Sequence, residues 1–186
     1  MIRVYQNPTP KTREELLMRP ALESVKLDDT VMEILNDVKE NGNNSLLSYA
    51  SKFDGVELDY INVSDKEIQT ASISKELEEA IKLAKSNIEK FHSKQIIEEP
   101  VVETIEGVKC WRKSVPIEKV GLYIPGGSAP LFSTVLMLGV PAMLAGCEEV
   151  ILCTPPDKEG KIDPAILFTA QLIGIKKLFK VGGAQA

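Results

Sequence analysis

Residues 120–127 read Val-Gly-Leu-Tyr-Ile-Pro-Gly-Gly, and this stretch decides the architecture of the second half of the chain. An uncharged run that ends in a Pro-Gly-Gly turn is typical of a short buried strand. Further strand segments follow at residues 149–153 and 177–181, so the three strands begin 29 and then 28 residues apart. Apolar helical segments lie between them and are closed by Gly146 and Gly174. The pattern predicts a βαβαβ unit, an α/β fold with a Rossmann-like parallel sheet and right-handed crossovers.

The first hundred residues predict helices instead. Apolar residues at helical spacing indicate helices over residues 30–40, 45–53 and 75–94. In the last of these, five apolar residues recur at steps of four and three, which predicts one buried stripe. They are Leu77, Ile81, Ala84, Ile88 and Phe91. A short extended piece at residues 61–63 runs into Ser64 and Glu67, which stand at the spacing of a capping box.

Residues 101–105 and 108–115 flank Glu106-Gly107, which predicts a β-hairpin. We therefore divide the chain into a mainly helical region (1–100), a hairpin connector (101–118) and the first part of the α/β domain (119–186). The chain stops three residues beyond the last βα turn, where the next crossover helix should begin. Because a parallel sheet needs helices on both faces, we expect an incomplete, truncated domain that is the front part of a longer protein.

The composition is that of a globular protein, with 44% hydrophobic and 26% charged residues among 186. No apolar run has the length of a membrane span, and no secretory signal is visible at the start, so we expect a cytoplasmic protein without a membrane partner. Residues 1–106 carry 13 basic against 21 acidic side chains, and residues 107–186 carry 9 against 6. An acidic first half argues against binding to nucleic acid.

The chain offers few residues for metal or nucleophilic chemistry. His92 is its one histidine, and Cys110, Cys147 and Cys153 show no CxxC spacing. A structural zinc site takes four closely spaced Cys and His ligands, and a nucleophilic site needs a base beside the nucleophile. We therefore assign no catalytic residue and no metal ligand within these residues.

A ligand of an open α/β sheet binds at the carboxyl ends of its strands. Tyr123 and Gln185 lie at two of these ends, beside double-glycine turns that let a backbone approach a ligand closely. The dinucleotide motif GxGxxG is absent, and no acidic residue closes the second strand. From the residues alone, a nucleotide or anion site and a purely structural role for the turns both stay open. Tyr123 is equally consistent with a packed strand aromatic, and Gln185 with an exposed polar residue in a first helical turn.

Several motifs together resemble the histidinol dehydrogenase family, and they extend over nearly the whole chain. The longest begins at Val120 and reads VGLYIPGGSAPLFSTVLM, ending at Met137. The others are residues 52–56 (KFDGV), 88–95 (IEKFHSKQ), 116–117 (PI), 141–142 (PA), 145–146 (AG), 154–156 (TPP) and 181–186 (VGGAQA).

The resemblance implies a zinc-dependent enzyme that oxidises L-histidinol through histidinal to L-histidine and passes two hydrides to two NAD molecules. It implies a homodimer with incomplete Rossmann-like domains. Tyr123 and Gln185 match the NAD-contacting tyrosine and glutamine of the family. The family's zinc ligands and its Glu-His pair for proton transfer are expected beyond Ala186, so the chain alone is expected to be inactive.

An enzyme fragment of this family is the leading interpretation, and two others stay open. The second is a stand-alone α/β module that binds a nucleotide or phosphate without catalysis. The third is an assembly piece whose acidic helices pair subunits.

Overall fold

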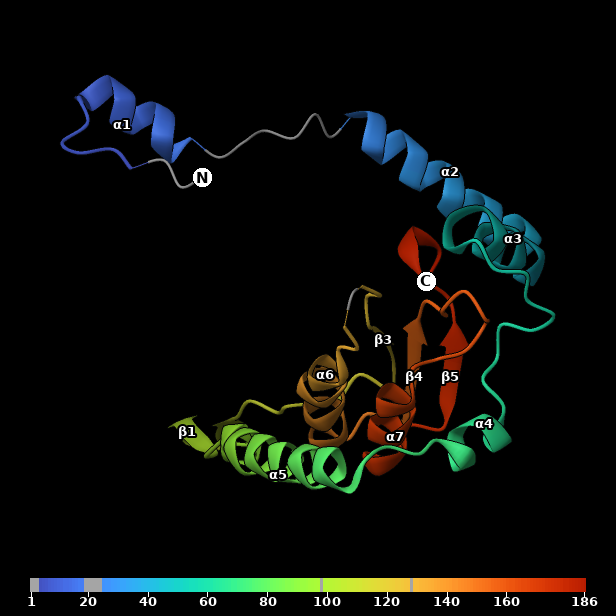
Figure 1. Ribbon diagram of the computed structural model, residues 1–186. Coiled ribbons are helices and arrows are strands. Elements are labelled where there is room, and N and C mark those ends of the chain that lie inside the picture. Colours follow the sequence, from blue (N-terminus) through green and yellow to red (C-terminus); the bar gives the residue numbers. More distant parts are fainter. Residues whose placement is uncertain (1–3, 19–24, 98, 128) are drawn as a thin grey trace.

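The structure is a computed structural model, and it describes residues 4–18, 25–97, 99–127 and 129–186. Its second half contains the predicted unit in the predicted order (Figure 1). The elements are β3 (Lys119–Tyr123), α6 (Phe132–Ala145), β4 (Glu149–Thr154), α7 (Pro164–Leu172) and β5 (Lys177–Lys180). The strands lie in the order β3-β4-β5, and both pairs are parallel. The α/β fold with a parallel sheet is therefore confirmed.

The crossover helices α6 and α7 pack against each other on one face of the sheet (Figure 1). Alternate side chains of the strands point toward them: Leu152 and Leu178 belong to the buried hydrophobic core, and Leu122 packs against it. The intervening side chains form the opposite face, where Tyr123 pairs in register with Cys153, and Cys153 with Phe179. These three side chains are only partly covered.

Helices form the first part of the chain, and several are longer or shorter than their patterns predict. They are α1 (Pro10–Leu17), α2 (Val25–Asn41), α3 (Asn43–Tyr49) continued by a π-helix (Ala50–Asp54), α4 (Asp65–Thr70) and α5 (Lys75–His92) continued by a 3₁₀-helix (Ser93–Gln95). Helix α5 packs along α6 as a further layer, and α2 packs against the last turn of the chain, the 3₁₀-helix η3 (Gly183–Gln185). None of the helices in the described ranges has the length and hydrophobicity needed to cross a bilayer.

The buried stripe predicted along α5 is only partly correct. Ile81 is fully buried, and Leu77, Ala84 and Ile88 pack at the edge of the core. Phe91 instead remains 66% exposed, because no part of the described chain covers that side of the last turn of α5.

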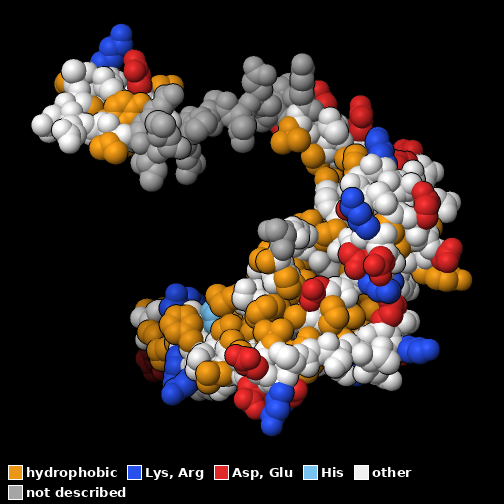
Figure 2. Space-filling model, in the orientation of Figure 1, with side chains coloured by type: hydrophobic (Ala, Val, Ile, Leu, Met, Phe, Trp, Pro, Cys, Tyr) orange, Lys and Arg blue, Asp and Glu red, His pale blue; other side chains and the backbone are white. Residues whose placement is uncertain are grey.

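The predicted hairpin forms from β1 (Val102–Ile105) and β2 (Val108–Cys110), and its second strand is shorter than expected. All seven strand residues are exposed. Figure 2 shows hydrophobic side chains gathered around this hairpin and the neighbouring end of α5. The hairpin thus buries little within the described chain, and the division into regions 1–100, 101–118 and 119–186 stays a prediction.

The extended piece at residues 61–63 adds an antiparallel segment beside β5. The Val63 amide donates to the Leu178 carbonyl at 3.0 Å, and the Lys180 amide donates to the Ile61 carbonyl at 2.6 Å. Helix α4 follows directly and has the predicted capping box, in which Ser64 accepts from the Glu67 amide and Glu67 accepts from the Ser64 amide.

An ion pair fastens this capping box to the sheet. Lys180 Nζ lies 2.7 Å from Glu67 Oε1, and the lysine side chain is only 11% exposed. Burial raises the pKa of the Glu67 carboxyl, but the hydrogen bonds from Lys180 and Ser64 outweigh burial, so the net pKa lies below its ordinary value of 4.5. The charged form of Glu67 therefore stabilises the folded state.

Replacing this carboxylate should weaken the fold in a pH-dependent way. Glu67→Gln is expected to lower the free energy of unfolding by about 1 kcal/mol at neutral pH, because it weakens both the cap and the ion pair. The folded pKa is lowered, so the stabilisation is present above the unfolded pKa and is lost as the pH falls through the folded value. Urea unfolding at neutral and at acidic pH should show the difference from wild type shrinking in acid.

Glu78→Gln is the matched control, because Glu78 pairs with Lys82 on the exposed surface of α5. We expect little change in stability at either pH for this variant. A loss of stability in Glu67→Gln that stays the same in acid would contradict the role assigned to the Glu67 charge.

Candidate functional site

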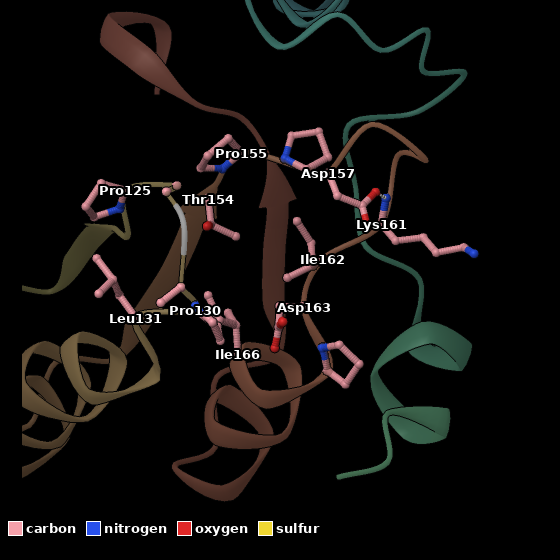
Figure 3. A pocket seen from close by; sticks show the side chains of 15 residues that line it. Pro125, Pro130, Leu131, Thr154, Pro155, Asp157, Lys161, Ile162, Asp163 and Ile166 are labelled. Atoms are coloured by element: carbon pink, nitrogen blue, oxygen red, sulfur yellow. Dashed lines mark hydrogen bonds between the residues drawn. The ribbon is translucent and has the colours of Figure 1, made fainter.

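Three loops meet at the carboxyl edge of the sheet, one after each strand (Figure 3). They run from residue 124 after β3, from residue 155 after β4 and from residue 181 after β5. This is the edge at which open α/β sheets bind ligands. Tyr123 and Gln185, the two residues predicted to contact a cofactor, lie on the first and the third of these segments.

Tyr123 connects the two outer strands of the sheet. Its hydroxyl oxygen accepts a hydrogen bond of 3.1 Å from the amide of Gly183, which follows β5. Strand β4 lies between β3 and β5, so the side chain spans its end. Tyr123 is 40% exposed, which differs from the alternative of a packed strand aromatic. Tyr123 therefore reaches from β3 to the turn that carries Gln185.

Gln185 is buried rather than exposed, which corrects the alternative interpretation of an exposed residue in a helical turn. Only 7% of it is accessible, because it lies in η3 beneath the contact with α2. Its Oε1 is buried and has no hydrogen-bond partner among the described residues. A buried acceptor without a donor costs about 1–3 kcal/mol, so this oxygen is suited to accept a hydrogen bond from a bound group.

Gly183 brings these two predicted residues together. Its φ of +69° is a left-handed conformation that favours glycine. A Cβ atom at this position would lie 2.6 Å from Gln185 Oε1, so a larger residue would displace the glutamine side chain. This turn therefore directs the Gly183 amide toward the Tyr123 hydroxyl oxygen and leaves space for the side chain of Gln185.

The double-glycine turns differ in what surrounds them. A Cβ atom on Gly126 or on Gly182 would meet the ring of Pro155, whereas a Cβ on Gly127 would meet nothing within 4 Å. Close approach of a ligand to the backbone is therefore open at Gly127. Pro155 and Gly183 are residues of this site that the sequence analysis did not single out, although the Pro-Pro pair after the second strand and the second glycine of the last doublet were visible signals.

A cavity of about 370 Å³ lies between the loops after β3 and β4 (Figure 3). Proline and aliphatic side chains make up much of its wall, with Thr154, Asp157, Lys161 and Asp163 as the polar side chains. Asp157 Oδ1 accepts hydrogen bonds from the amides of Glu159 and Lys161, which folds its own loop. A mostly apolar hollow with few polar groups is typical of small-molecule sites.

The remaining candidate residues lie outside this arrangement or carry no reactive form. His92 Nδ1 and Gln95 Oε1 are 2.7 Å apart at the end of α5. Cys153 stands beside Tyr123 on the sheet, and burial raises the pKa of its thiol, so it stays protonated at neutral pH. Within the described ranges, no three His, Cys, Asp or Glu residues are placed to hold a metal ion.

Comparison with known proteins identifies the family of the chain. The sequence model of the family described as histidinol dehydrogenase matches residues 17–186. The chain is 57% identical to the histidinol dehydrogenase of Bacteroides thetaiotaomicron over 100% of this chain and 44% of that protein. It is 48% identical to that of Salmonella typhimurium over 98% of this chain and 42% of that protein.

A crystal structure of histidinol dehydrogenase from Elizabethkingia anophelis matches with a TM-score of 0.90 at 51% identity, over 97% of this chain and 42% of that chain. The chain therefore spans less than half the length of these relatives. The resemblance read from the sequence motifs is confirmed, both in sequence and in structure. Since the family match begins at residue 17 and continues to the last residue, the chain belongs to the histidinol dehydrogenase family.

Proposed function

We propose that this chain forms the N-terminal part of an enzyme that oxidises L-histidinol to L-histidine through histidinal. Each turnover consumes one water and reduces two NAD molecules, because two hydrides leave the carbinol carbon in succession. The observation that carries the proposal is the meeting of Tyr123 and Gln185 around Gly183 at the carboxyl edge of the sheet, in a chain of this family. The last step of histidine biosynthesis is the corresponding metabolic role.

The residues at this edge fit NAD chemically. Gln185 Oε1 is a buried acceptor that lacks a donor, and NAD carries amide and hydroxyl donors. The Tyr123 oxygen already accepts from Gly183, so its own O–H proton is left to be donated to an acceptor of the cofactor. Gly127 leaves the backbone open to close approach. When bound, NAD supplies the hydride acceptor, and these residues bind and orient it.

Zinc has no corresponding donor set in the described part of the chain. We place the zinc ligands and the residues that move protons beyond Ala186, in the portion of the relatives that this chain does not span. No step that uses zinc is derived from these residues. The residues of the described chain are expected to contribute cofactor binding.

We further propose a cytoplasmic homodimer. The three cysteines are unpaired, which suits a reducing compartment. Helix α1 has no buried residue and exposes Leu16 and Leu17, and Figure 2 shows hydrophobic side chains on it. Because no residue of α1 is buried within the described part of the chain, we propose that this apolar surface packs on the second subunit.

The activity itself provides the first test of this proposal. The full-length protein that contains this chain should reduce two NAD per L-histidinol consumed, measured by NADH absorbance and by chromatography of L-histidine. The 186-residue chain alone should show no turnover, because it lacks the proposed zinc and proton-transfer residues. Turnover by the chain alone would contradict this division of roles. NAD binding without turnover by the full-length protein would favour the binding-module interpretation.

A second test addresses the buried glutamine. In the full-length protein, Gln185→Leu should raise the Kd of NAD about tenfold, the effect of losing one hydrogen bond of about 1.4 kcal/mol. Calorimetric titration with NAD measures this change. Gln69→Leu, on the exposed surface of α4, is the matched control and should leave the Kd unchanged. Equal affinities for both variants would remove Gln185 from the cofactor site.

A further inference from the structure

Pro155 occupies the space between the two double-glycine turns. It follows the last residue of β4, the central strand, while Gly126 follows β3 and Gly182 follows β5. A Cβ atom on Gly126 would lie 2.6 Å from Pro155 Cγ, and a Cβ atom on Gly182 would lie 2.6 Å from Pro155 Cβ. Distances this short do not occur between real side chains. Both glycines therefore allow one proline ring to fit between the outer loops.

Backbone conformation does not explain these two glycines. Gly182 has φ −114° and ψ 174°, which any residue adopts, and Gly126 is not among the glycines with positive φ. Gly183 differs, because its φ is +69°. What Gly126 and Gly182 supply is the absence of a side chain, and the group that uses the space is Pro155.

The hydrogen bond from Gly183 to Tyr123 joins the same two outer segments of the sheet that Pro155 separates. Gly182 directly precedes Gly183, and Gly126 lies three residues after Tyr123. The ring of proline has a fixed φ and no rotamer freedom, so it holds a set distance between the parts that contact it. We propose that Pro155 is a positioning residue, which keeps the turns after β3 and β5 at the spacing that aligns Tyr123 and Gln185.

The part of this inference that concerns NAD rests on the proposed function, whereas the packing does not. The packing is tested first, by thermal unfolding. Gly126→Ala should lower the Tm by about 5 °C, because the new methyl group overlaps the proline ring. The double variant Gly126→Ala, Pro155→Ala should regain the lost Tm, because alanine at position 155 has no Cγ. The nearest contact of the new methyl group is then the Cβ atom of residue 155, at an ordinary 3.6 Å.

Gly182 supplies the matched control. Gly182→Ala should also lower the Tm, but adding Pro155→Ala should not restore it, because the overlapping atom at 2.6 Å is Cβ, which alanine retains. We expect Pro155→Ala to restore the Tm of the Gly126→Ala variant but not that of the Gly182→Ala variant. A Gly126→Ala variant as stable as wild type, or equal rescue at both sites, would overturn the packing.

Positioning is tested with Pro155→Ala in the full-length protein by two readouts. Hydrogen exchange of the Gly183 amide, followed by NMR, should accelerate about tenfold, as it should in Tyr123→Phe, because both changes weaken the same hydrogen bond. The KM for NAD should rise about tenfold while the KM for L-histidinol stays within twofold. The variant Gly126→Ala, Pro155→Ala should regain stability and keep the raised KM for NAD.

Each outcome of these measurements bears on one proposal. Unchanged Gly183 exchange in Pro155→Ala would overturn the positioning role, whatever the enzyme does. Faster exchange of the Gly183 amide with an unchanged KM for NAD would show that the spacing of the two turns does not affect cofactor binding. That result would also overturn the positioning role. A wild-type protein that fails to reduce NAD would refute the proposed function, and the exchange measurement would still decide whether Pro155 positions the two turns.

Discussion

Parallel pairing of β3, β4 and β5 is the constraint on which the candidate site depends. In a parallel sheet, every strand ends at the same edge, so the loops that follow them meet there. Tyr123 and Gly183 are 60 residues apart in the sequence and are nevertheless joined by a hydrogen bond of 3.1 Å. The crossover helices make this possible, because they return the chain to the opposite edge before each new strand. The distances between the loops are then set by packing at the edge.

Much of the fold could be predicted because its signals are local. The three strands and two crossover helices follow from the repeat of apolar segments and glycine stops, and the capping box at Ser64 and Glu67 follows from a spacing of three residues. The identities of Tyr123 and Gln185 as candidate residues came from motif resemblance. Spacing alone indicated this edge as the place where a ligand would bind and left a purely structural role for the turns open.

What could not be predicted depends on contacts between distant segments. Gln185 is buried because α2, near the start of the chain, packs against the last turn, and no local pattern reports this contact. Phe91 lies at a position that continues the apolar stripe of α5, yet it remains exposed. A periodic pattern states which side chains share a face of a helix. It does not state how far along the helix another element covers that face.

The glycine doublets extend this argument to the site. The pairs Gly126-Gly127 and Gly182-Gly183 look alike in the sequence, but their members meet three different surroundings. The first glycine of each pair gives space to Pro155, Gly183 adopts a left-handed conformation, and Gly127 faces open space. A glycine in a sequence shows that a side chain is absent, and only the fold shows what occupies the space. The two turns therefore differ in structure: the turn after β3 leaves the backbone of Gly127 uncovered, and the turn after β5 holds the donor for Tyr123 and the buried glutamine.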